Sequence, residues 1–223
     1  MPTYEELGFG QGAALSGDRA RTVFAHVMGL VAITFGFATL GAYVARNMNG
    51  GGFVFIIAAF ADIFALNYAA ARGHEQAAVG LLFLLGLLLG MFVSPVIVYY
   101  AKTDPGVVYQ AAGATALFTA LLGSIGYTTR KDLAPYYRFV FIAFIVVLVA
   151  GLIAFLVAIP HANVIYSVLM LAIFGFFTMF DFQRLSRNPS YQSAPLIAAS
   201  IFLDIFNVFL LFLSLFGGGS NRR

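Results

Sequence analysis

The 223-residue chain contains no cysteine and no tryptophan, and only 9% of its residues are charged. Without cysteine it can form no disulfide and perform no thiolate chemistry. Without tryptophan, only tyrosine is left to supply an aromatic belt at a membrane surface. An ordinary soluble domain is about 25% charged, so this composition excludes one. The net charge of +3 is small and gives no reason to expect a nucleic-acid partner.

Apolar residues dominate instead, at 61% of the chain, with a mean hydropathy of +0.94. They fall into seven runs, each near the roughly 20 residues that one membrane span requires: 22–45, 53–71, 77–100, 107–128, 136–158, 164–182 and 194–216. The runs predict an all-α membrane protein whose seven transmembrane helices form one domain, 22–216. Polar tails, 1–21 and 217–223, flank it. Pro95 lies well inside the third run and should kink that helix or end it early.

Lysine and arginine residues favour one orientation, because short cytoplasmic loops carry an excess of them. With the N-terminus inside, the inner loops hold Arg19, Arg21, Arg72, Arg130, Lys131, Arg138, Arg184 and Arg187. The outer side holds Arg46, Lys102, Arg222 and Arg223. We therefore expect tail 1–21 in the cytoplasm and, with seven spans, the C-terminus outside. A re-entrant seventh run would instead leave both ends inside.

Only three acidic residues, Asp62, Asp181 and Asp204, fall in or at the edge of the runs. An acid inside the bilayer costs about 2.5–3.5 kcal/mol on insertion scales, so each is a candidate functional residue. Asp204 lies ten residues into the seventh run, about 15 Å along its axis. It can meet Asp181 only if the sixth helix ends deeper than the seventh begins, or if the segment between them packs inward.

Two carboxylates in contact cannot both ionise cheaply, so the pair would titrate as one unit and share a proton at lower pH. The alternative is that Asp204 is a lone protonated acid bonded to Asn207 or to a backbone carbonyl. Arg72, at the inner end of the second run, either pairs with Asp181 or reaches the membrane surface as an unpaired arginine. Asp62 either lines a polar cavity or bonds to a hydroxyl on another helix.

Several classes of protein lack their signatures here. A retinal pigment needs an intramembrane lysine, but Lys102 and Lys131 both lie in loops. No His-Glu-x-x-His, Gly-x-Ser-x-Gly or Walker sequence occurs. We therefore expect no enzyme activity and no cofactor.

Four stretches together resemble the transmembrane Bax inhibitor motif family: GMFVSPVI, ALFTALLGSIGYTTRKDL, MFDFQRL and SIFLDIFNVFLLFLSLFG. The resemblance implies a seventh helix at the centre, wrapped by the other six. It also implies a pH-sensitive calcium leak, here in a bacterial inner membrane. By the same resemblance Asp181 and Asp204 form the pH-sensing gate and Arg72 is a latch on Asp181. Arg184 and Arg187 could compete with Arg72 for that role.

The leading expectation is thus a cation leak in which Asp181 and Asp204 also form a weak transit site for calcium, with lipid and calcium as partners. Asp62 and Asn207 are candidates to line the pore. Composition alone fits protons or other cations equally well. The alternative is a non-conducting regulator that binds a membrane protease or stress-response protein. A proton-coupled carrier is a third reading. We expect a monomer or a weak oligomer.

Overall fold

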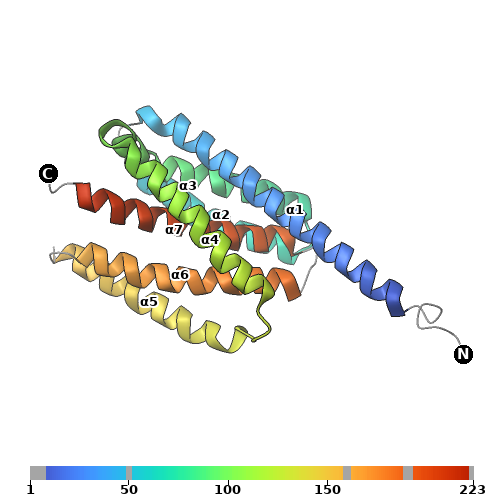
Figure 1. Ribbon diagram of the computed structural model, residues 1–223. Helices are drawn as coiled ribbons and strands as arrows, with labels where there is room; N and C mark the ends of the chain where they lie inside the picture. Colours follow the sequence, from blue (N-terminus) through green and yellow to red (C-terminus); the bar gives the residue numbers. More distant parts are fainter. Residues whose placement is uncertain (1–8, 49–51, 158–161, 188–192, 221–223) are drawn as a thin grey trace, which may run out of the picture.

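The computed structural model describes residues 9–48, 52–157, 162–187 and 193–220. They form seven long helices with one short 3-10 helix after the first (Figure 1): α1 (Phe9–Val44), η1 (Ala45–Asn47), α2 (Gly52–Ala71), α3 (Glu75–Thr103), α4 (Pro105–Thr128), α5 (Ala134–Leu156), α6 (Ala162–Arg187) and α7 (Ala194–Ser220). All seven are long and apolar enough to cross a membrane, and the described ranges contain no strand. The prediction of an all-α, seven-helix membrane protein is confirmed.

Several helix bounds differ from the sequence prediction, and the differences in α1, α7 and α3 bear on the fold. α1 begins at Phe9, inside the expected tail 1–21, although its membrane-crossing part begins at Arg21. α7 continues to Ser220, inside the expected tail 217–223. α3 runs through Pro95 to Thr103, so the expectation that proline would end it early is wrong. Proline removes only one backbone hydrogen bond, and contacts with α1 and α2 support the rest of the helix.

α7 contacts more of the other long helices than any of them does. It packs against α1, α2, α3, α4 and α6, and more than half of its most apolar stretch is buried. In the part of the chain that the structure describes, α5 packs only against α6, and none of its most apolar stretch is buried. Five helices therefore surround α7 instead of the expected six, because α5 stands outside α6 (Figure 1).

A close helix crossing joins α1 to α3 through glycine. A Cβ atom on Gly90 would collide with the Ala38 carbonyl, and one on Gly86 would collide with the Thr34 carbonyl. Small residues let helices approach this closely in lipid, where packing drives association. The crossing fixes α3 between α1 and α2, and so fixes the position of the walls of the site described below.

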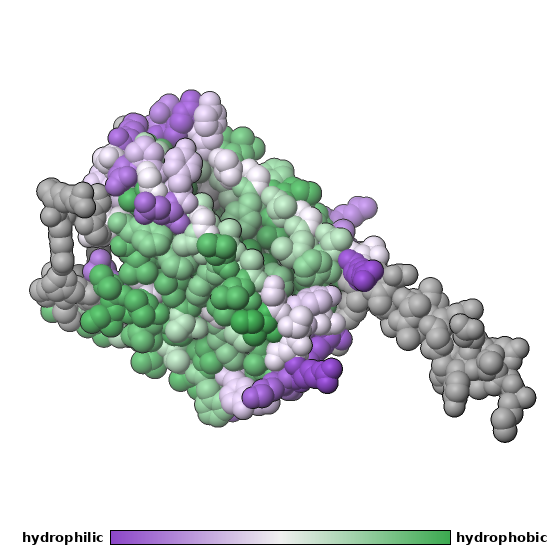
Figure 2. Space-filling view, in the orientation of Figure 1, coloured by the Kyte–Doolittle hydropathy of each residue, from purple (hydrophilic) through white to green (hydrophobic). Residues whose placement is uncertain are grey.

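The surface and the helix directions agree with a membrane-crossing bundle. Hydrophobic side chains cover the middle of the molecule, and hydrophilic ones gather toward its two ends (Figure 2). α1 begins at one end of the bundle and α7 finishes at the other (Figure 1). α7 is one continuous helix long enough to cross a membrane, which favours a seventh span over a re-entrant run.

Candidate functional site

Asp181 of α6 and Asp204 of α7 line the same cavity, which has a volume of about 470 Å³. Its wall also includes residues of α2, α3 and α5. Both carboxylates are buried, with only 7% and 6% of each residue exposed. The polar residues of the wall come from three helices, α5, α6 and α7: Tyr137, Tyr166, Asp181, Arg184, Ser200, Asp204 and Asn207. This set is a polar site inside an otherwise apolar bundle.

The length of α6 explains how the two acids meet. The sequence predicted that this helix ends at Phe182, but it continues to Arg187. Asp181 therefore lies six residues, about 9 Å, inside the helix end rather than at the membrane surface. Asp204 lies ten residues into α7, and the two acids are near enough for their charges to interact. The two acids thus line one cavity with Asp181 inside a longer α6 than the sequence predicted.

The hydrogen-bond partners of the two acids differ. The Ser200 hydroxyl, one turn before Asp204 on α7, reaches the Asp181 carboxylate. The Oδ2 atom of Asp204 is buried and has no hydrogen-bond partner in the structure. Asn207 donates from Nδ2 to the Leu203 carbonyl at 2.8 Å, so this amide hydrogen is used within its own helix. The buried Asp204 oxygen is left free to take a proton or a cation.

Arg184 supplies the positive charge of the site. It follows Asp181 by three residues on α6, is half-buried, and interacts with the charge of Asp181. It also lines an adjoining cavity of about 170 Å³, and Ile63, Ser200 and Leu203 are shared by both walls. Among the described wall residues of the two cavities it is the only lysine or arginine. Arg184 thus places one positive charge at the boundary between the two cavities.

The other predicted residues lie outside the cavity wall. Arg72 is exposed, with its guanidinium 5.0 Å from the centre of the Tyr68 ring, and within the described ranges it makes no salt bridge. Asp62 is 5% exposed, and neither of its carboxylate oxygens has a hydrogen-bond partner. Its neighbours Ala59 and Ile63 line the cavity, but Asp62 itself does not. The latch and pore-lining roles of these two residues stay predictions.

Two side chains near the end of α6, which the sequence did not single out for this task, hold the loop between α4 and α5. Gln183 donates to the Lys131 carbonyl at 2.6 Å and accepts from the Leu133 N–H at 2.9 Å. Arg187 forms a salt bridge with Asp132 at 3.1 Å. Gln183 is 3% exposed, and an amide this buried needs such partners. No spacing in the sequence indicates contacts between residues 50 or more positions apart.

The cavity offers few oxygen ligands for a cation. Across the residues that the structure describes, no three His, Cys, Asp or Glu side chains come together as a metal cluster. Calcium usually takes six to eight oxygen ligands. Two carboxylates and the Ser200 hydroxyl supply only part of that shell, with water and carbonyl groups left to complete it. A permeant ion must bind weakly enough to leave, and the weak calcium transit site expected at Asp181 and Asp204 stays a prediction.

Comparisons with known proteins agree on one family. Residues 20–222 match the family described as inhibitor of apoptosis-promoting Bax1. A Helicobacter pylori protein is 30% identical over 170 residues, covering 76% of this chain and 73% of its own length. A Vibrio cholerae membrane protein is 32% identical over 139 residues, covering 60% and 61%. A Chlamydia muridarum protein is 25% identical over 232 residues, covering 96% of each chain. With seven apolar helices and this match over nearly its whole length, the chain belongs to the Bax inhibitor-1 family of membrane proteins.

Proposed function

We propose that the protein is a pH-sensitive calcium leak of the membrane, gated by Asp181 and Asp204. The observation that carries the proposal is the shared cavity, in which two buried carboxylates from neighbouring helices face a single arginine. Family membership and the seven-helix fold support it. Two carboxylates in a low-dielectric site hold one proton between them more easily than they hold two negative charges.

The direction of the pH response follows from that pair. At lower pH the shared proton joins the two acids and stabilises the packing of α6 against α7. At higher pH the proton is lost, and the two negative charges repel each other across the cavity. The repulsion loosens the packing and admits cations to oxygen atoms that were paired before. Calcium flux should therefore rise with pH.

Arg184 is the cation best placed to balance the acids, because it lines both cavities and interacts with Asp181. This favours Arg184 over Arg72 as the charged partner within the site. We further propose that the protein lies in a bacterial inner membrane with its N-terminus in the cytoplasm. Relatives from bacteria and the excess of arginine and lysine at one end of the spans support that placement.

Proteoliposomes that contain only this protein and an internal calcium dye test the proposal over a pH series. Flux should rise with pH in the native protein and should lose that dependence in Asp181→Asn and Asp204→Asn. Asp62→Asn is the matched control, because it removes a buried carboxylate from the same bundle but not from the cavity wall. It should keep the pH response.

If the protein is folded but calcium flux exceeds that of empty liposomes at no pH, the leak is refuted. That result would favour the non-conducting regulator, which should tolerate loss of both aspartates. A pH response that persists in both aspartate variants would leave the leak standing but refute the gate.

A further inference from the structure

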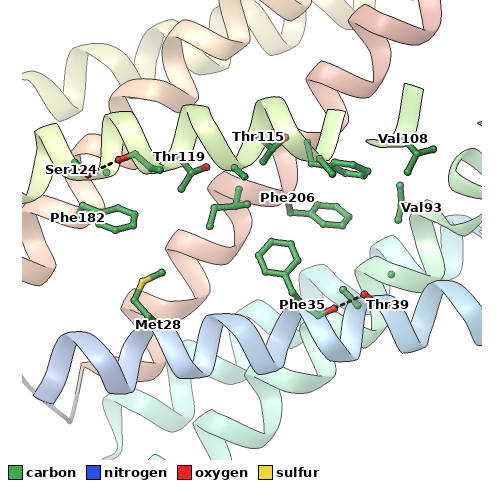
Figure 3. A pocket seen from close by; sticks show the side chains of 18 of the residues that line it. Met28, Phe35, Thr39, Val93, Val108, Thr115, Thr119, Ser124, Phe182 and Phe206 are labelled. Carbon is green, nitrogen blue, oxygen red and sulfur yellow. Dashed lines mark hydrogen bonds between the residues drawn. The ribbon is translucent and has the colours of Figure 1, made fainter. Parts of the chain in front are cut away.

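A second cavity, of about 910 Å³, lies between α1 and α4, with α7 behind it (Figure 3). Its volume is near the upper end of the roughly 300–1,000 Å³ found for small-molecule sites. At one end the rings of Phe24 and Tyr127 meet edge to face, with 5.2 Å between their centres. Elsewhere along their described lengths α1 and α4 make no close backbone contact. Because α1 and α4 stand apart along their described lengths, the cavity opens between them toward the lipid.

The wall of this cavity is uncharged. Small residues on one face of α4 make the space: Ala112, Ala116, Ala120 and Gly123. Larger apolar side chains from α1 and α7, including Phe35 and Phe206, stand opposite (Figure 3). The described wall contains no Asp, Glu, Lys, Arg or His. A charged ligand would lose its hydration without gaining a partner, so the occupant must be neutral where it lies in the cavity.

One hydroxyl in the wall differs from its neighbours. Thr39, Thr115, Ser124 and Thr128 each donate to a carbonyl four residues earlier in their own helix, at 2.6–2.9 Å. Thr119 makes no such bond: its Oγ1 atom is buried without a partner, and the residue is 8% exposed. Its side chain points into the cavity (Figure 3). Rotation about its Cα–Cβ bond among the staggered positions lets this hydroxyl meet a ligand.

The depth of Thr119 in the membrane limits which lipid-soluble ligands can form a hydrogen bond with it. It lies nine residues before Thr128, the last residue of α4, which is about 13 Å along the axis. The hydrocarbon core is about 30 Å thick, so Thr119 is near its middle. An ordinary saturated acyl chain has no hydrogen-bonding atom at that depth. A chain that carries a hydroxyl or keto oxygen near its middle does.

We propose that this cavity binds an acyl chain of a membrane phospholipid that carries such a mid-chain oxygen. The chain enters between α1 and α4, and its oxygen pairs with the Thr119 hydroxyl. Arg21 and Arg130, both exposed, lie three residues beyond Phe24 and Tyr127 at the closed end. Their charge complements the phosphate of an anionic headgroup at that membrane surface. The proposal does not depend on the calcium leak.

A matched pair of probes measures the contribution of the ligand's mid-chain oxygen to binding. Heptadecane and its mid-chain ketone, heptadecan-9-one, differ only in one carbonyl group. We would measure binding of each to the purified full-length protein in detergent. The infrared band of the ketone would be recorded as well, because a hydrogen bond from a hydroxyl lowers its frequency. The native protein should prefer the ketone about fivefold, as one neutral hydrogen bond allows, and should shift its band.

Thr119→Val should abolish both the preference and the band shift, while Thr119→Ser should keep them. Thr115→Val is the matched control, because the Thr115 hydroxyl lies in the same wall but is already bonded to the Ala111 carbonyl. It should leave the preference intact. Ala116→Phe, which fills the cavity, should weaken binding of both probes.

Three results would refute the proposed binding site: equal binding of ketone and alkane, equal effects of Thr119→Val and Thr115→Val, or no effect of Ala116→Phe.

A second experiment tests whether the occupant is a phospholipid. The native protein should melt at a higher temperature in nanodiscs of phosphatidylglycerol with an oxo group halfway along one chain than in nanodiscs of unmodified phosphatidylglycerol. Thr119→Val should melt at the same temperature in both. A rise of the same size in both proteins, or in neither, would refute the phospholipid as occupant.

Discussion

Replacing Arg184 by Gln should move the midpoint of the flux–pH curve to higher pH. Residues three apart on a helix have Cβ atoms about 5–6 Å apart. Opposite charges at about 6 Å attract by about 3 kcal/mol at an effective dielectric constant of about 20. Arg184 is only half-buried, so solvent screening reduces this to about half. The attraction favours the ionised acid pair, and its loss should require about one more pH unit to remove the shared proton.

The assay is calcium flux in proteoliposomes at closely spaced pH values, with Arg72→Gln as the matched control. Arg72 is exposed over the Tyr68 ring at one end of α2, so its loss should leave the midpoint where it was. A shift in Arg72→Gln without one in Arg184→Gln would refute the reasoning. It would show that the latch implied by family resemblance operates in a conformation other than this one. Equal flux curves in all three proteins would mean that neither arginine acts on the gate.

Two further predictions concern stability. Gln183→Leu should lower the free energy of unfolding by about 1–3 kcal/mol, because it leaves the Leu133 N–H and the Lys131 carbonyl without their partner. Thermal unfolding followed by circular dichroism measures this loss of stability. A melting temperature equal to that of the native protein would contradict the prediction. Gly90→Val should destabilise the bundle more severely, because its Cβ would meet the Ala38 backbone, which cannot move aside. Gly80→Val is the control in the same helix and assay, because a Cβ at Gly80 would meet nothing within 4 Å. Equal losses of stability in the two variants would argue against a close α1–α3 crossing.

The sequence predicted what depends on local composition. Seven apolar runs gave the number of helices, and isolated acids in those runs gave the candidates Asp181 and Asp204. It could not give the end of α6, because four of the five residues 183–187 are polar and the stretch resembles a loop until their partners are known. Those partners are in the loop after α4, which only the folded chain brings near Gln183 and Arg187. The unbonded hydroxyl of Thr119 is equally hidden, since five other hydroxyl side chains of the cavity wall look the same in sequence.

The packing divides the bundle into two groups of three helices on either side of α7. α3 packs closely on both α1 and α2, while α6 packs closely on both α4 and α5. Gln183 and Arg187 strengthen the second group by joining α6 to the loop between α4 and α5. Contacts between the groups are few, and the cavity between α1 and α4 occupies much of that boundary. Repulsion between Asp181 and Asp204 acts between α7 and the second group. We therefore expect that group to move relative to α7 as one body, which would change the widths of both cavities together.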